Sequence, residues 1–337
     1  MNTTTDLGTP KLVIAGGSGY LGRRLVRAAL GRGSEVVVLS RRGGGEISGA
    51  RVVEWDGRTR GEWVRELEGA AGLVNLAGES VNCRYTRRAL AAMDGSRVDS
   101  TRVLGDAIHG CVVPPRVWVQ ASSLAIHGDG GDRWCDEEAG PGTGPGVVTA
   151  RKWERAFAES PTPRTRRVVL RISFVLGRGG GALSMLERAT RAFLGGAVGS
   201  GRQYVSWIHE SDMNRILLRA VEDSGMSGIY VASSPDPVRN EEFMRELRGM
   251  LGRPWAPRTP AWLVRVGCWL MRTEPMLALT GRRGDPRRLE EAGFTFRFPT
   301  LREALVDLYE SEGLAAPART AVSDGPVGMR KLALKWR

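Results

Sequence analysis

Short apolar runs rich in β-branched residues alternate along the chain with longer segments in which apolar residues recur every three or four positions. The runs predict buried strands and the longer segments predict helices between them. Strands are expected at 12–15, 35–39, 51–56, 72–79, 117–120, 168–172 and 229–232. Helices are expected at 21–30, 63–67, 87–108, 148–159, 183–193, 212–221, 240–251, 261–271, 287–292 and 301–309.

Strict alternation of strand and helix predicts an α/β fold, a doubly wound parallel sheet of the Rossmann type. After about residue 175 the alternation loosens, which indicates a smaller, mostly helical C-terminal substrate lobe. We therefore expect a dinucleotide-binding domain over 1–175, with late elements from 200–232, and a lobe over 176–310. Residues 313–337 are rich in Ala, Pro and Gly with a basic end, and we expect a disordered tail there.

The first strand runs directly into a glycine-rich turn, Gly16-Gly17-Ser18-Gly19-Tyr20-Leu21-Gly22, and then into a helix. A strand, a glycine turn and a helix in this order are typical of a pyrophosphate-binding site, because the helix N-terminus offers free N–H groups. Gly16 allows the tight turn, Gly19 lets the backbone approach the ligand, and Gly22 lets the helix pack on the strand. The expected contacts are Gly16, Ser18, Gly19, Tyr20, Leu21 and Gly22.

The end of the second strand bears on the choice of cofactor. Ser40-Arg41-Arg42 contains no acidic residue that could bind the ribose 2′-OH of NAD, and two guanidiniums suit the 2′-phosphate of NADP. NADP(H) is therefore expected in preference to NAD(H); the alternative is that both arginines are only solvated. Further cofactor contacts are expected after the third, fourth and fifth strands: Asp56, Asn75, Leu76, Ala77, Gly78 and Ser122.

The net charge of +12 and a pI near 10.3 raise the question of a nucleic acid or anionic partner. Lysine occurs only four times, at 11, 152, 331 and 335, so the excess is arginine spread along the chain. No aromatic-interleaved basic motif is present, and we expect no nucleic acid. Without an apolar run of about 20 residues or a leader-like N-terminus, neither a membrane partner nor secretion is expected. Four scattered cysteines favour reduced thiols in the cytoplasm and no metal site.

These motifs resemble the extended, epimerase-like branch of the short-chain dehydrogenase/reductases: GGSGYLG (16–22), NLAG (75–78), ASSLAIHG (121–128) and LRISFVLG (170–177). NLAGESV (75–81), SRVDSTRVL (96–104), GSGRQYVSWIHESD (199–212) and RRLEEAGFTFRFPTLREAL (287–305) are similar to an atypical subgroup, the "epimerase family". Its small C-terminal domain of unknown function would cover about 252–305. The resemblance implies NADP(H) binding, a substrate that is not established, and a possible homodimer.

In that superfamily a serine, a tyrosine and a lysine carry the reaction: the tyrosine exchanges a proton with the substrate, and the lysine holds the nicotinamide ribose. Ser123 matches the serine. No tyrosine precedes a lysine by four residues, and Val148 stands four before Lys152, so the Tyr-x-x-x-Lys pair is absent. The subgroup places Arg-x-Trp-Glu there, here residues 151–154. His127 is a candidate proton donor; the alternative is a packed ring that replaces an aromatic residue.

Four residues near 200–210 are candidate substrate contacts: Arg202, Gln203, Trp207 and His209. Arg202 could hold an anion through two parallel hydrogen bonds, or be a solvated loop residue. His209 could contact substrate or make a structural hydrogen bond. Trp255, Trp262 and Trp269 recur at intervals of seven and predict lobe packing, with an aromatic substrate wall or a dimer surface as alternatives.

The sequence thus predicts an NADP(H)-binding, epimerase-like oxidoreductase of unknown small-molecule substrate. Whether it is an enzyme stays open. One possibility is an NADP-dependent oxidoreductase or nucleotide-sugar epimerase-like enzyme; the other is a non-catalytic NADP(H) sensor or scaffold, which the missing tyrosine and lysine favour.

Overall fold

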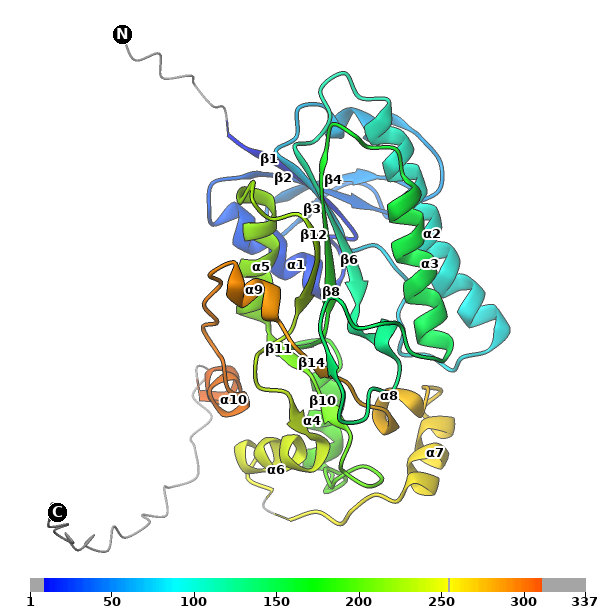
Figure 1. Cartoon of the computed structure of the whole chain (residues 1–337), viewed down its shortest axis with the longest axis vertical. Coiled ribbons are helices and arrows are strands. Elements are labelled where there is room, and N and C mark those ends of the chain that lie inside the picture. The colour runs from blue at the N-terminus through cyan, green and yellow to red at the C-terminus, as the bar shows by residue number, and fades with distance from the viewer. Residues whose placement is uncertain (1–8, 254, 311–337) are drawn as a thin grey trace, which may run out of the picture.

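A computed structural model of the chain describes residues 9–253 and 255–310, and its centre is one large, mostly parallel sheet (Figure 1). The sheet order is β12-β8-β6-β5-β1-β2-β4-β3, and only β3 runs antiparallel to its neighbour. The strands span β1 Lys11–Ala15, β2 Glu35–Ser40, β3 Glu46–Ile47, β4 Ala50–Glu54, β5 Gly72–Asn75, β6 Val117–Ser123, β8 Arg166–Ile172 and β12 Gly228–Ala232. The order reverses between β1 and β5, where doubly wound sheets open a crevice for a dinucleotide.

Helices cover both faces of this sheet (Figure 1). On one face lie α1 (Tyr20–Leu30) and α5 (Glu210–Glu222); on the other lie α2 (Arg87–His109) and α3 (Pro145–Glu159), with the 3₁₀ helix η1 (Glu62–Leu67). The strands are apolar on both sides because each side packs against helices, and Val13 and Ile14 of β1 are fully buried in different core clusters.

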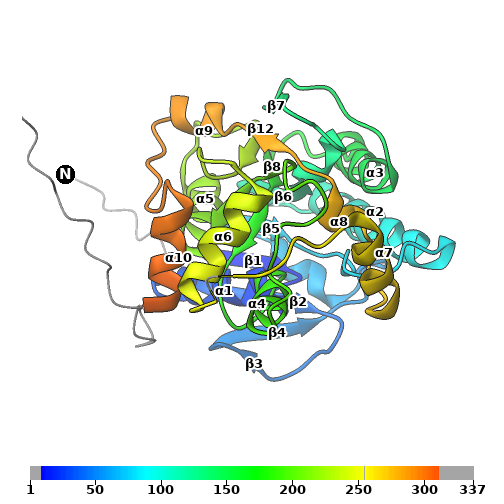
Figure 2. The same cartoon turned by 90° about the horizontal axis from the view of Figure 1, so that it is seen from below.

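The remaining helices form a lobe beyond the carboxyl ends of the strands. They are α4 (Leu183–Arg191), α6 (Asn240–Met250), α7 (Ala261–Leu270), α8 (Met276–Leu279), α9 (Arg287–Glu291) and α10 (Leu301–Glu310). Seen from below, α6 and α10 lie on one side of this end and α7 and α8 on the other (Figure 2). Trp207, Phe243 and Leu305 belong to a separate apolar core of the lobe.

Two-residue and three-residue strand pairs join the lobe to the sheet domain. They are β9 (Phe174–Leu176) with β11 (Trp207–His209), β10 (Tyr204–Val205) with β13 (Val238–Arg239), and β7 (Trp134–Cys135) with β14 (Arg283–Gly284). A short 3₁₀ helix, η2 (Leu124–His127), follows β6. The sequence did not predict these short pairs, because two residues carry no detectable period and their partners lie far along the chain.

The outer strand β12 is covered by the C-terminal part of the chain. Helix α9 packs on it, and the Arg288 guanidinium donates hydrogen bonds to the carbonyl oxygens of Ile229 and Ser227, the latter at 3.2 Å. The same guanidinium lies 4.5 Å from the centre of the Tyr230 ring. This edge of the sheet is therefore closed by the lobe.

The predicted α/β class, the Rossmann-type sheet and the helical C-terminal region are confirmed. Each expected strand and helix forms, with ends shifted by a few residues; the segment at 63–67 is a 3₁₀ helix. The expected tail at 313–337 lies outside the described residues. No helix in the described part of the chain is long and apolar enough to cross a membrane.

Candidate functional site

The glycine turn between β1 and α1 is closely packed. Gly16 has φ +79°, and a Cβ on it would lie 2.8 Å from the Ala77 nitrogen, so only glycine fits. A Cβ on Gly22 would lie 2.5 Å from the Gly17 Cα. Helix α1 begins after Gly19 without a side-chain cap, so its first N–H groups stay open to an anion. The turn therefore fits the pyrophosphate predicted for it.

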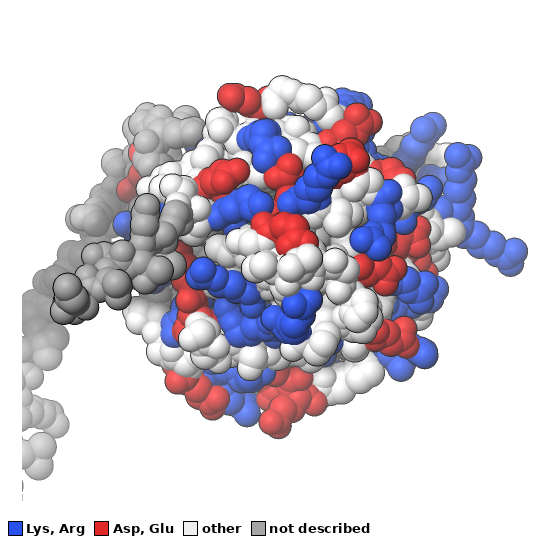
Figure 3. All heavy atoms as spheres, turned by 90° about the horizontal axis from the view of Figure 1, so that it is seen from above, with Lys and Arg blue, Asp and Glu red and all other residues white. Residues whose placement is uncertain are grey.

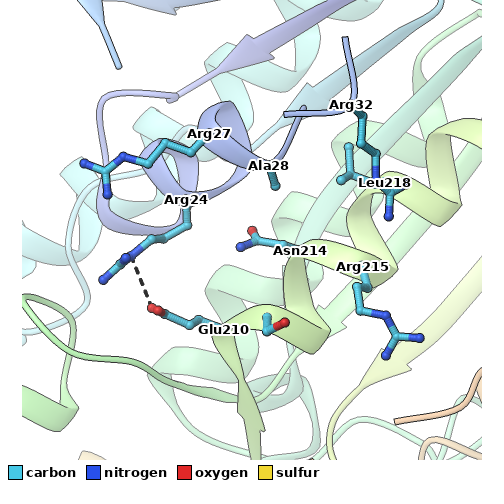
Figure 4. A pocket seen from close by; sticks show the side chains of 9 residues that line it. Arg24, Arg27, Ala28, Arg32, Glu210, Asn214, Arg215 and Leu218 are labelled. Atoms are coloured by element: carbon cyan, nitrogen blue, oxygen red, sulfur yellow. Dashed lines mark ion pairs between the residues drawn. The ribbon is translucent and has the colours of Figure 1, made fainter. Parts of the chain in front are cut away.

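Two residues of the turn direct their side chains away from the crevice. The Tyr20 hydroxyl donates to Glu210 of α5, and its ring packs on Gly180 and Gly181. Burial and the hydrogen bond to Glu210 raise the pKa of Tyr20 above its ordinary value. Glu210 also pairs with Arg24 at 3.2 Å (Figure 4). Leu21 packs against the core, so any cofactor contact of Tyr20 or Leu21 is left to the backbone.

The residues after β2 and β4 lie at the surface around Ser40. The Ser40 hydroxyl, largely buried, accepts the Arg42 amide at 3.4 Å. Arg41 pairs with Glu79 at 2.7 Å, and the Arg42 side chain is exposed. The Asp56 carboxylate accepts three hydrogen bonds from Thr59 and Arg58, which lower its pKa to about 2. Arg42 is therefore the guanidinium beside Ser40 that has no ion pair within the described residues, while Arg41 is held by Glu79 and the Asp56 oxygens are held in a local turn.

A buried amide network fixes the loop after β5. The Asn75 side chain donates to Gln120 at 3.0 Å and accepts the Ala77 amide at 3.0 Å. The Leu76 amide donates to the Ala15 carbonyl at 2.8 Å. Leu76, Ala77 and Gly78 are thus held against the glycine turn, as expected for the wall of a cofactor crevice.

Ser122 and Ser123 at the end of β6 have different partners. The Ser122 hydroxyl donates to Glu154 of α3 at 2.6 Å, and Glu154 forms a two-bond ion pair with Arg171 of β8, both at 3.0 Å. The Ser123 oxygen accepts the Ala125 amide at 3.1 Å, and its proton is free to donate. Ser123 can therefore bind a substrate oxygen, as predicted.

The His127 ring is fully buried, and its Nδ1 lies 3.2 Å from the Gly140 carbonyl oxygen. Burial lowers the pKa of His127, so the neutral ring is favoured. Both facts favour the packed-ring alternative over a proton donor.

The α3 helix brings no tyrosine and lysine pair to the side that lies toward Ser123. Val148 is half exposed, and Lys152 pairs with Asp94 of α2, so neither faces Ser123. The residue that does face this side is Gly146: a Cβ on it would meet only the Ala125 Cβ, at 3.8 Å. Four residues on, Ala150 is buried. Gly146 and Ala150, four residues apart, carry no titratable side chain, so this side of α3 supplies no tyrosine and lysine either.

The four predicted substrate residues are not brought together. Trp207 is fully buried in the lobe, and its indole N–H donates to the Asp236 carbonyl at 2.7 Å. The Gln203 amide donates to the carbonyls of Val198 and Ala278. His209 is buried, accepts the Ser211 amide at 3.1 Å and lies 3.3 Å from Asp307. Of the four, only Arg202 presents an exposed side chain.

Sequence reasoning missed one buried charged residue that packs on the loop after β5, Arg97 of α2. Only 9% of its surface is exposed. Its guanidinium lies 5.0 Å from the centre of the Trp153 ring and packs on Gly78. The signal was present, because Arg97 stands four residues after Met93 and four before Thr101 on the buried stripe of the helix. The described residues contain no group of His, Cys, Asp or Glu that could hold a metal.

The sequence of the chain matches known families and proteins over most of its length. Residues 12–232 match the NAD dependent epimerase/dehydratase family, and residues 259–308 match a domain of unknown function, DUF1731. The chain is 33% identical to the mouse epimerase family protein SDR39U1 over 310 residues, covering 88% of this chain and 99% of the relative. It is 29% identical to the Bacillus subtilis epimerase family protein YfhF over 306 residues, covering 88% and 97%.

Two solved structures extend the comparison. Human SDR39U1 (isoform 2) with NADPH matches with a TM-score of 0.80 and 31% identity, over 89% of this chain and 99% of that one. A nucleoside-diphosphate sugar epimerase from Corynebacterium glutamicum matches with a TM-score of 0.72 and 28% identity, over 90% of this chain and 58% of that one.

Proposed function

The chain belongs to the NAD dependent epimerase/dehydratase family, and we propose that it is an NADP(H)-binding oxidoreductase, epimerase-like in architecture, that acts on a small polar molecule. When bound, the cofactor would supply or accept a hydride. The uncapped start of α1, the rigid loop after β5 and the arginines after β2 are the residues that would hold it.

The observation that carries this proposal is the hydrogen bonding of Ser123. Its oxygen already accepts the Ala125 amide, which holds the side chain in place, and no acceptor within the described residues takes its proton. A substrate carbonyl or hydroxyl oxygen is such an acceptor, and polarising that oxygen favours hydride transfer to the adjoining carbon. The proton that the reaction exchanges would come from water or from the substrate itself, because Gly146 and Ala150 offer no acid.

Preference for NADP(H) over NAD(H) is supported by Arg41 and Arg42. Replacing both with alanine is expected to weaken NADPH binding at least tenfold and to leave NADH binding nearly unchanged, because only NADPH carries the 2′-phosphate. Arg155→Ala, on the surface of α3, is the control. Tighter binding of NADH than of NADPH by the unaltered protein would contradict the assignment.

The test of turnover is stopped-flow oxidation of bound NADPH against carbonyls, quinones and nucleotide sugars. Ser123→Ala is expected to slow the reaction about a hundredfold and to leave NADPH affinity within twofold. Ser184→Ala, which removes a hydroxyl from α4 outside the crevice, should change neither.

A non-catalytic sensor or scaffold is the second candidate, and the Gly146 and Ala150 pair favours it. Tight NADPH binding without oxidation by any compound of the panel would support this second reading. The four cysteines, all free thiols, fit a reducing compartment, and we propose the cytoplasm.

A further inference from the structure

Arg97 is a buried cation that has no carboxylate partner. Its guanidinium donates to the Met93 carbonyl at 3.2 Å, and within the described part of the chain no acidic oxygen lies within ion-pair distance. The acidic groups that influence it are Tyr85, Asp94, Glu79 and Cys83. Both carboxylates are engaged elsewhere, Glu79 with Arg41 at 2.7 Å and Asp94 with Lys152 and Thr149. Burial lowers the pKa of Arg97, because the charged guanidinium is less stable away from water.

Enclosed arginines of this chain differ in their partners: Arg282 also has no ion pair among the residues that the structure describes and donates to the Thr280 hydroxyl at 3.4 Å, with Asp129 among the charges near it. The groove between α1 and α5 is lined by four partly exposed arginines; Arg24, Arg32 and Arg215 pair with carboxylates, and Arg27 donates to the Ser48 hydroxyl at 3.3 Å. Figure 4 marks the pair of Arg24 with Glu210. Arg171, as buried as Arg97, has the two-bond pair with Glu154. A buried charge without a partner is costly, so Arg97 needs acceptors from outside the chain.

The position of the Arg97 guanidinium indicates which acceptors these are. It lies on the Trp153 ring of α3 and against Gly78 of the loop after β5; a Cβ on Gly78 would be 3.0 Å from the central guanidinium carbon. This corner lies between two ends of the expected cofactor site. Glu79, next to Gly78, pairs with Arg41 of the adenine half, and Glu154, next to Trp153, accepts the Ser122 hydroxyl at the end of β6 beside Ser123. The nicotinamide half, which would extend from the pyrophosphate toward Ser123, would pass this corner.

We propose that Arg97 binds the nicotinamide half of NADP(H), donating to its ribose hydroxyls and adjoining phosphate, and so stands in for the lysine that α3 lacks. This inference rests on the proposed function. A guanidinium keeps its proton near neutral pH, so Arg97 binds and orients but does not act as an acid. Its stacking on Trp153 holds the planar group in place, as a flexible lysine would not be held.

The test separates the two halves of the cofactor. Dissociation constants are measured for NADPH and for 2′,5′-ADP, which carries only the adenine half. Arg97→Met is expected to weaken NADPH binding about tenfold to a hundredfold and to leave 2′,5′-ADP binding within twofold. Arg97→Lys keeps the charge and should recover part of the loss. Arg102→Met, on the exposed face of α2, is the matched control and should change neither constant.

A second measurement excludes a merely structural role. The melting temperature of Arg97→Met is expected to be equal to or above that of the unaltered protein, because a desolvated charge without a partner has been removed. Unchanged NADPH affinity, or an equal loss for NADPH and 2′,5′-ADP, overturns the inference. If the unaltered protein bound neither ligand, the proposed function itself would fail, so the two failures are distinguishable.

Discussion

Ser122 and Ser123 are adjacent on β6, yet one hydroxyl is committed to a buried ion pair and the other is open. Alternation along a strand points the two side chains to opposite faces, which the sequence predicts. The partner of Ser122, Glu154, lies on a different element, which no local pattern reveals. For the same reason the local motifs predict roles for Ser123, the glycine turn and Arg41, whereas the burial of Trp207 and His209, both predicted as substrate contacts, depends on elements distant in sequence.

His127 gives a pH prediction at this scale. Its pKa is lowered by burial, so the folded protein binds this proton less tightly than the unfolded chain does. The stability that the neutral ring contributes is complete above the ordinary histidine pKa of about 6.5 and is lost as the pH falls below it. Calorimetry from pH 7.5 to 5.0 should show a falling melting temperature, with a shallower fall in His127→Tyr. Part of the slope should remain, because burial lowers the pKa of His209 as well. Parallel curves for the two proteins would contradict the assignment.

At the scale of elements, the long strands and helices follow from sequence period, while the pairs β7–β14 and β10–β13 follow from tertiary contacts. The long loop at 128–146 illustrates this, because part of it forms β7 only where β14 of the lobe lies beside it. The position of α1 depends more on local sequence than these short strand pairs do, because its close packing on β1 requires the glycines of the turn that joins them.

Gly22→Ala tests that approach. The added Cβ would meet the Gly17 Cα at 2.5 Å, so α1 must shift away from the turn. We expect a loss of about 1–3 kcal/mol in the free energy of unfolding, measured with urea, and weaker NADPH binding. Gly95→Ala is the control, because Gly95 lies inside α2 and its Cβ would meet nothing closer than 3.5 Å. That change should stabilise the protein by roughly 0.5–1 kcal/mol. Equal effects of both substitutions would refute the packing role of Gly22.

At the scale of the whole molecule, one carboxylate ties the C-terminal segment to the sheet domain. Asp212 of α5 is fully buried, accepts the amides of Arg297 and Phe298 at 2.9 Å, and pairs with Arg215 at 2.7 Å. Asp212→Asn replaces an acceptor with a group that also carries N–H donors. We expect a loss of about 3 kcal/mol in the free energy of unfolding. Asp106→Asn, on the exposed side of α2, should change it little, and a similar small effect at Asp212 would show that this junction is not needed.

The net charge of +12 also belongs to this scale. Acidic and basic side chains are interspersed on the face shown in Figure 3, as the distribution along the sequence led us to expect. We expect no shift of duplex DNA in a gel at roughly 0.15 M salt, because on the face shown acidic side chains interrupt the basic ones that would contact a phosphate backbone. Binding that persisted there, with a steep dependence on salt, would show that the arginines do form a nucleic-acid surface.

The closure of β12 by α9 bears on how the chain is made. During synthesis β12 leaves the ribosome before the segment that will cover it. In that interval the carbonyl oxygens of Ile229 and Ser227 lack the Arg288 guanidinium and face any neighbouring chain, while the Val231 amide can already donate to Glu137, as it does at 2.7 Å in the folded protein. A chain interrupted between the sheet domain and α9 would keep this part of the edge open. Truncated products are therefore expected to aggregate, and the C-terminal domain protects the sheet whatever part it takes in binding a substrate.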